Sequence, residues 1–171
     1  MNTSQIEGDN MSGFKQFGLN AGGGVYFKFH PKWSFSTEIL YSMRGSNGTP
    51  YVNGFPLAYP AILRINTDYV EVPLFVSFHD KKYAMFGAGL SIAGLVHYNY
   101  IEQGKDMSNT PKFSDYYKKY DLSLFGNVTF FFSNHIGLNL RWAYSIIPIT
   151  TDKVVDSQNH NVISVRMMYL F

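Results

Sequence analysis

Apolar residues alternate with polar or small residues along most of this chain. The pattern is clearest in the last eleven residues, 161–171, where every odd position from Ile163 to Phe171 is apolar and the even positions include Ser164 and Arg166. Successive residues of a β-strand point to opposite faces. The pattern therefore predicts a final strand with one fully apolar face and one face that carries an arginine.

Six further segments alternate in the same way and predict six more strands: 17–29, 33–44, 68–78, 83–98, 120–132 and 136–146. These are longer than the usual strands of soluble sheets, which have about five or six residues. Short turns at 30–32, 79–82 and 133–135 alternate with long polar loops at 45–66, 99–118 and 148–159. Residues 1–13 are polar and predict an N-terminal loop. We expect one domain, residues 1–171, that forms an antiparallel up-and-down sheet.

The more polar face of the predicted strands carries charged residues, namely Lys28, Glu38, Glu71, Asp121, Arg141 and Arg166. If this face lines a lumen, the apolar face is on the outside, as in a transmembrane β-barrel of the outer-membrane type. A lipocalin-like soluble barrel that binds a small hydrophobic ligand would have the opposite arrangement. The alternation favours the membrane barrel and keeps the ligand-binding barrel as the alternative.

Aromatic residues lie close to both ends of the predicted strands, which is typical of the two interfaces of a membrane. One group lies beside the short turns: Phe27, Phe29, Trp33, Phe35, Phe78, Phe130, Phe132, Tyr169 and Phe171. The other group lies beside the long loops: Tyr41, Tyr98, Tyr100, Tyr120 and Tyr144. A general preference of aromatic residues for strands explains their number but not their position.

Composition narrows the functional classes. The chain is 46% hydrophobic and only 15% charged, against about 25% charged in an average soluble domain. A net charge of +2 gives no reason to expect nucleic-acid binding, and the absence of cysteine excludes disulfide scaffolds. The histidines have no nucleophile or carboxylate at motif spacing. We therefore expect no enzyme activity, no cofactor and no metal site.

Four of the inward-facing charges, Glu38, Glu71, Arg141 and Arg166, fall near the middle of their strands. In an eight-stranded ring the two acids and the two arginines would face each other across the lumen. Because an arginine fork matches a carboxylate and unpaired buried charges are costly, we expect a structural ion-pair cluster that plugs the barrel. The alternative is a wet interior in which each charge is hydrated separately.

Several motifs resemble a known family: Gly18–Gly24, Glu38–Gly45, the Y-x-E-x-P-L element at Tyr69–Leu74, and Gly87–Gly89. Together they are similar to the PorT-like outer-membrane β-barrel family. The resemblance implies a small eight-stranded barrel in the cell outer membrane, exported through a signal peptide. It also implies a glycine-rich first strand upstream of residues 2–8. Neither the signal nor that strand is visible, so we expect a truncated chain that has seven of the eight strands.

The resemblance also bears on function. Val165, Met167, Tyr169 and Phe171 resemble the C-terminal signal that barrel-assembly machinery reads. One PorT-like branch is linked to protein secretion. We expect a small non-porin barrel with a structural or partner-binding role through its outer loops. Its expected partners are outer-membrane lipid, the barrel-assembly machinery, and an envelope or secretion protein.

Overall fold

The computed structural model describes residues 1–8, 13–48, 51–52, 55–56, 63–80, 83–102, 104–106, 117–151 and 157–171. These residues form antiparallel strands only: β1 Asn2–Glu7, β2 Gln16–Gly18, β3 Asn20–His30, β4 Trp33–Gly48, β5 Tyr51–Val52, β6 Phe55–Pro56, β7 Leu63–Asp80, β8 Ala84–Glu102, β9 Lys105–Asp106, β10 Tyr120–Phe131, β11 Ile136–Ser145 and β12 Asn159–Tyr169. In the described part of the chain, no helix is long and apolar enough to cross a membrane.

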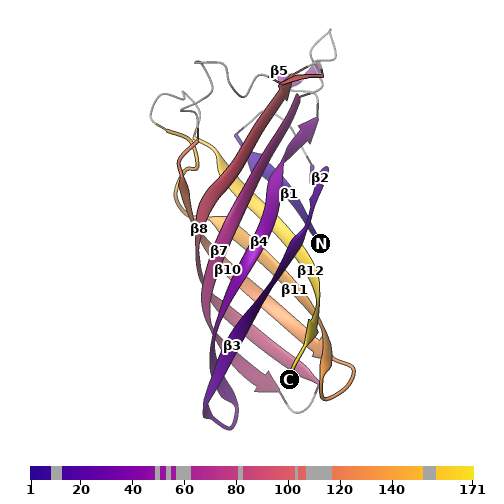
Figure 1. Ribbon diagram of the computed structural model, residues 1–171, viewed down its shortest axis with the longest axis vertical. Coiled ribbons are helices and arrows are strands. Elements are labelled where there is room, and N and C mark those ends of the chain that lie inside the picture. Colours follow the sequence, from indigo (N-terminus) through magenta and orange to yellow (C-terminus); the bar gives the residue numbers. More distant parts are fainter. Residues whose placement is uncertain are drawn as a thin grey trace.

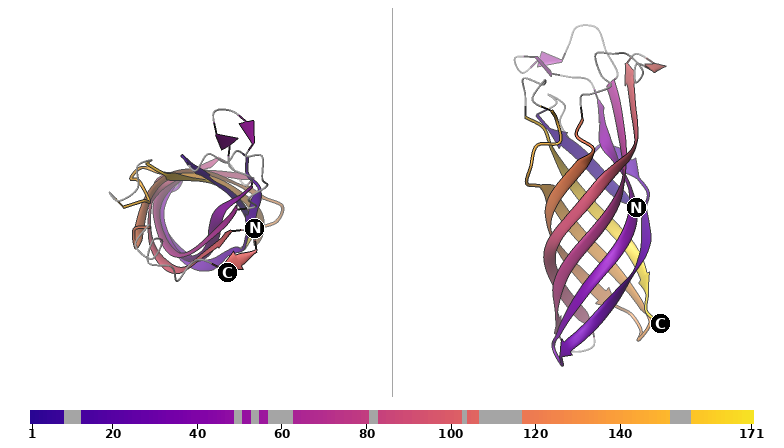
Figure 2. Two further views of the ribbon diagram at one scale, coloured as in Figure 1. Left: turned by 90° about the horizontal axis from the view of Figure 1, so that it is seen from above. Right: turned by 60° about the vertical axis from the view of Figure 1, so that its left-hand side comes forward.

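Ten of these strands form one sheet that curls into a tall barrel (Figures 1 and 2), and β5 and β6 pair with each other in a separate small sheet. The order of the strands is β2-β1-β12-β11-β10-β8-β7-β4-β3, and β9 extends the edge of β8. β2 and β3 stand at the two ends of this order, but only Leu19 separates them in the chain. They are therefore consecutive parts of one nearly continuous strand. The upper half of the ring is therefore closed through β1, and the all-β antiparallel barrel expected from the alternation is confirmed.

The predicted N-terminal loop is wrong for residues 2–7, which form β1. This strand pairs with β12 from Asn2↔Ser164 to Glu7↔Asn159, and with β2 on its other edge. The side chains of β1 also fix it in place. The Ser4 hydroxyl bonds the backbone of Gly45, and Glu7 accepts hydrogen bonds from Tyr144 and Asn161. Neither face of β1 is apolar, so hydrophobic alternation could not reveal this strand.

The bounds of the long loops are also corrected. β4 continues to Gly48 and β7 begins at Leu63, so both ends of the predicted loop 45–66 belong to a ladder that runs from Gly45↔Asn66 to Gly48↔Leu63. β8 likewise continues to Glu102, inside the predicted loop 99–118, and β12 begins at Asn159. The remaining parts 49–50, 53–54, 57–62, 103, 107–116 and 152–156 lie outside the described residues.

Burial in this barrel is the reverse of burial in a soluble protein. Among the described residues, 25 polar or charged residues are buried against 12 hydrophobic ones. Large apolar side chains such as Val72, Leu90 and Ile92 stand exposed on the outer wall. Apolar surface of this extent is stable only when lipid, rather than water, covers it. The polar interior also differs from the apolar lumen of a lipocalin-like soluble barrel.

The aromatic groups are only partly placed as expected. Trp33, Phe130 and Phe132 are exposed on the outer wall near the short turns. At the other end Tyr98 and Tyr100 are not on the outer wall but pack against a buried apolar cluster inside the barrel. The register shift between Asp68 and Tyr69, opposite this part of β8, changes which residues face the lumen there.

We predict that an arginine on the outer wall destabilises the barrel according to its depth. Leu90 is exposed and lies between Leu74 and Leu124 in the ladders, far from both ends of β8. Leu90→Arg should lower the free energy of unfolding by about 2–4 kcal/mol, because the guanidinium would lie in hydrocarbon. Val96→Arg, closer to the long-loop end of the same strand, should cost only about 0–1 kcal/mol. Denaturant unfolding in lipid vesicles measures both, and equal costs would contradict a membrane-spanning outer wall.

Candidate functional site

Six charged side chains meet in the lumen and define a lumen charge cluster. The members are Glu38 and Arg44 on β4, Glu71 on β7, Asp121 on β10, Arg141 on β11 and Arg166 on β12. All point inward because they share the parity of the buried serines and asparagines on the same strands. Three arginines face three carboxylates, so the formal charge of the cluster is zero.

Arg44 lies at the centre of the cluster and is only 1% exposed. Its Nη2 contacts Glu71 Oε1, and its Nη1 lies 2.7 Å from Asp121 Oδ2. The guanidinium carbon lies 5.1 Å from the centroid of the Tyr69 ring, within the range of a cation–π contact. One arginine therefore ties three strands, β4, β7 and β10, together through a forked pair of charge-assisted hydrogen bonds.

Arg141 is bound less completely than Arg44. Its Nη2 lies 3.5 Å from Glu71 Oε2, at the limit of a hydrogen bond, and its guanidinium carbon lies 3.7 Å from the centroid of the Phe125 ring. Its Nε and Nη1 have no hydrogen-bond partner among the described residues. The ring of Phe125 therefore replaces a second carboxylate as the main neighbour of this cation.

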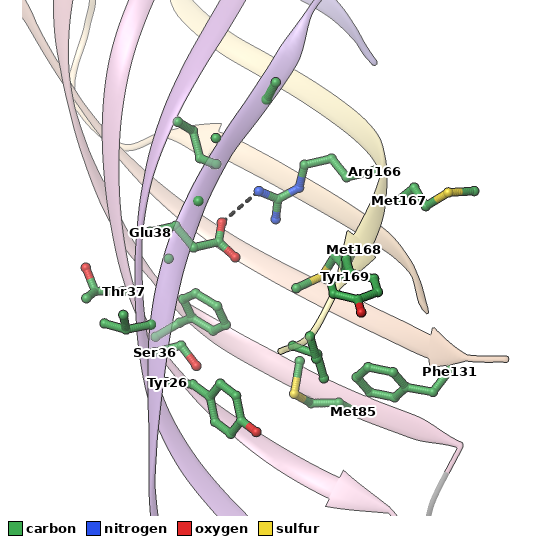
Figure 3. A pocket seen from close by; sticks show the side chains of 18 of the residues that line it. Tyr26, Ser36, Thr37, Glu38, Met85, Phe131, Arg166, Met167, Met168 and Tyr169 are labelled. Carbon is green, nitrogen blue, oxygen red and sulfur yellow. Dashed lines mark hydrogen bonds and ion pairs between the residues drawn. The ribbon is translucent and has the colours of Figure 1, made fainter. Parts of the chain in front are cut away.

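Arg166 forms the lower part of the cluster (Figure 3). Its Nη1 donates to Glu38 Oε2 at 2.7 Å, and its Nε and Nη2 donate to Asn139 Oδ1 at 3.3 and 2.9 Å. All three nitrogens of this guanidinium have an acceptor. The pair joins β12 to β4, two strands that share no ladder.

The structure places all four sequence-predicted residues, Glu38, Glu71, Arg141 and Arg166, inside the lumen and pairs each acid with an arginine. The sequence reasoning placed Asp121 on the inward face but left both Asp121 and Arg44 out of the cluster. In the predicted strands 33–44 and 120–132, Arg44 is the last residue and Asp121 the second, so both lie next to long loops. Because β4 and β7 extend farther than the alternation predicted, Arg44 lies well below the rim. A correct bound for β4 would have been sufficient to include it.

Apolar layers lie on both sides of the charge cluster. Toward the long-loop end, Ile6, Ile65, Tyr117 and Ile149 form a buried cluster that we call the upper plug. Tyr117 also donates a hydrogen bond from its hydroxyl to Gln158 at 3.2 Å. On the other side, Phe75 and Phe125 pack edge to face with ring centroids 5.5 Å apart. Side chains thus fill the lumen at several levels, as expected for a narrow barrel.

The described residues offer little catalytic chemistry. No group of three histidine, aspartate or glutamate side chains among them could hold a metal ion. A hydroxyl–imidazole pair does exist near the short-turn end, where Ser34 Oγ lies 2.8 Å from His79 Nε2. Ser34 is fully buried, so its hydroxyl cannot reach a substrate. We assign this pair a structural role.

Comparison with known proteins agrees with the geometry. The outer membrane protein beta-barrel domain family matches residues 1–151. The chain belongs to this family. It is therefore a protein of the cell outer membrane, and in such barrels the short turns face the periplasm and the long loops face outward.

Two solved structures have a similar fold. One is Ail, the attachment invasion locus protein of Yersinia pestis, with 12% identity, a TM-score of 0.57, and coverage of 99% of this chain and 93% of Ail. The other is the same protein in complex with the heparin analogue sucrose octasulfate, with 14% identity, a TM-score of 0.50 and the same coverage. At these identities the likeness concerns the fold alone. A search of curated proteins gave no match.

We predict that Glu71→Ala destabilises the barrel strongly. The substitution would leave the buried Arg44 and Arg141 without their shared carboxylate, and breaking such a buried pair costs about 3–5 kcal/mol. Lys119→Ala, at an exposed side chain, is the matched control and should change the free energy of unfolding by less than about 0.5 kcal/mol. Denaturant unfolding in vesicles measures both. Equal stability of the two variants would support a wet interior with separately hydrated charges.

Proposed function

We propose that this protein is a sealed, non-porin outer-membrane barrel that binds a partner through its outward end. The observation that carries the proposal is the filled lumen. The charge cluster and the upper plug occupy successive levels of the interior, which leaves the outer surface as the place for specific recognition. The proposal includes no catalytic role.

The shape of the outward end supports this role. A transmembrane strand needs only about 9–11 residues, whereas β7 has 18 and β8 has 19. These two strands project beyond the rest of the barrel in Figure 1. Their outer parts are paired from Leu63↔Glu102 to Asp68↔His97, so they form a stiff ribbon rather than a loop. A rigid scaffold of this kind suits loops that bind a partner.

The comparisons suggest the class of partner. The printed description of Ail is an attachment invasion locus protein, and one of its structures contains a heparin analogue. The resemblance of the Tyr69–Leu74 element to PorT-like barrels suggests instead an envelope or secretion protein. We favour a protein partner in the envelope, because a net charge of only +2 offers little excess positive charge for a polyanion such as heparin.

The two remaining partners follow from the outer wall and the last strand. Outer-membrane lipid would cover the exposed apolar face. Val165, Met167, Tyr169 and Phe171 are all exposed on that face, so they are accessible to barrel-assembly machinery before insertion. We propose them as the C-terminal assembly signal. The hydrophobic-ligand alternative has less support, since the lumen holds the charge cluster.

We predict that the refolded protein does not conduct ions. In planar bilayers the wild-type barrel should give no stepwise channel openings, because the charge cluster and the upper plug block the lumen. A variant with both Arg44 and Tyr117 replaced by glycine removes one large side chain from each level and is the comparison for an opened lumen. Porin-like conductance of the wild-type protein would contradict the proposal.

We predict that shortening one outer loop removes the partner and leaves the barrel intact. Gly48 and Leu63 are opposite each other at the end of the β4–β7 ladder, so an Asn-Gly turn can replace residues 49–62. Cross-linking in native envelopes should recover a partner with the full chain and lose it with the shortened chain. Unchanged heat-modifiable migration would show that the shortened barrel still folds. If the shortened chain keeps the partner, recognition does not use this loop.

A further inference from the structure

The outer wall carries polar residues where β11, β12 and β1 run side by side near the long-loop end (Figure 1). The two ladders arrange the outward residues of these strands in three rows. The rows are Asn159 and Glu7; Tyr144, Asn161 and Gln5; and Trp142, Ile163 and Thr3. All of them except Ile163 can form hydrogen bonds through their side chains. We call this set of residues the polar wall patch.

The neighbouring strands have no such residues in the same row. From Tyr144 the row continues in the other direction to Leu124 on β10, Leu90 on β8 and Leu74 on β7. These three leucines are exposed on the outer wall, as expected for a surface that lipid chains cover. Polar side chains would be costly on a wall that contacts hydrocarbon alone. Their concentration on three adjacent strands therefore indicates contact with a polar group.

Hydrogen bonds between the three strands hold the side chains of the patch in place. The Glu7 carboxylate accepts from Asn161 Nδ2 at 2.9 Å and from the Tyr144 hydroxyl at 3.0 Å. Asn161 Oδ1 in turn accepts from Trp142 Nε1 at 2.9 Å. Trp142, Asn161, Glu7 and Tyr144 thus form one connected network. A site whose side chains are already ordered loses less entropy when a ligand binds.

Two aromatic rings lie at the centre of this network. The centroids of the Trp142 and Tyr144 rings are 6.4 Å apart, and their planes are inclined by only 29°. Trp142 is 51% exposed, so much of its indole is available for contact. The face of an aromatic ring carries negative charge density, which attracts the weakly positive C–H groups on one face of a sugar ring.

The polar members of the network supply the other half of sugar recognition. A carboxylate has about four lone-pair sites, and the bonds from Asn161 and Tyr144 occupy two of those on Glu7. The remaining sites can accept hydrogen bonds from sugar hydroxyls. The same negative charge would repel a phosphate group. The patch therefore suits an uncharged sugar rather than a phosphorylated headgroup.

The position of the patch identifies the source of the sugar. It is continuous with the apolar outer wall, since Leu140 and Val165 are exposed in the next outward row below Trp142 and Ile163. It also lies near the long-loop end, which faces outward in barrels of this family. We propose that the polar wall patch binds the uncharged sugar headgroup of a glycolipid in the outer leaflet. This site adds a specific contact to the general contact with lipid and does not depend on the protein partner.

The chain has two tryptophans, Trp33 and Trp142, which permits an optical test. In a Trp33→Phe background, tryptophan fluorescence comes from Trp142 alone. The barrel is placed in phosphatidylcholine nanodiscs with increasing amounts of digalactosyl diacylglycerol, an uncharged glycolipid. We expect a saturable change in Trp142 emission. Phosphatidylglycerol, which has a charged phosphate headgroup, should give no saturable change.

Substitutions test the residues, with native mass spectrometry as the measure of retained digalactosyl diacylglycerol. Trp142→Leu and Glu7→Ala should each weaken retention about tenfold. Trp142→Phe keeps an aromatic face and should retain more of the glycolipid than Trp142→Leu. Trp33→Leu is the matched control, because Trp33 is also exposed but lies beside a short turn. It should leave retention unchanged. Heat-modifiable migration shows that each variant folds.

Several outcomes would overturn the proposal. One is equal retention by Trp142→Leu and Trp33→Leu, and another is retention of phosphatidylglycerol as strong as that of the glycolipid. Displacement of the glycolipid by soluble digalactose would assign the patch to a free saccharide. Loss of the cross-linked protein partner from Trp142→Leu, with glycolipid retention unchanged, would assign it to a protein. Shortening of loop 49–62 should leave glycolipid retention unchanged, so the two proposals can fail separately.

Discussion

The need to pair every backbone polar group in hydrocarbon is the constraint on which this structure depends. Strands can satisfy it only by forming a closed ring, because any free edge exposes N–H and C=O groups to lipid. Six residues, Asn2–Glu7, close the upper half of the ring by pairing with β12 and β2. Their polar side chains then anchor to Gly45, Tyr144 and Asn161. Closure here rests on pairing and hydrogen bonding rather than on apolar burial.

Closing the ring encloses an interior whose polar and charged groups also need hydrogen-bond or ion-pair partners. The apolar residues of each strand face outward, so the alternate, mostly polar residues face inward and fill the lumen. Their burial is tolerable because positive and negative charges occur in equal number and most of them are directly paired. Arg44 joins three strands through two acids, and Arg166 joins two strands that share no ladder. The charge cluster thus fixes which strands face each other across the lumen, which hydrophobic packing alone would not specify.

The sequence predicted the features that follow from the alternation of apolar and polar residues. It failed for the features that depend on backbone pairing between strands. Alternation was sufficient for the seven long strands, the outward apolar face and the inward position of Glu38, Glu71, Arg141 and Arg166. It could not find β1, because Asn2, Ser4 and Glu7 make neither face of that strand apolar. It also ended β4 before Gly45, where glycine and asparagine resemble a loop but continue a ladder with β7. That error put Arg44 at the very end of its predicted strand and left it out of the expected cluster.

The Arg166–Glu38 pair supports the lower half of the barrel, where β12 and β4 share no ladder. Above Met1, backbone ladders hold β12 against the strands on both sides. Below it, the ladder of β12 among the described residues is the one with β11, and the ion pair reaches across the lumen to β4. Asn139 on β11 accepts from the same guanidinium, so Arg166 is itself held from the paired side. The pair therefore fixes the distance between β12 and β4 through side chains, at a level where no backbone ladder joins these two strands.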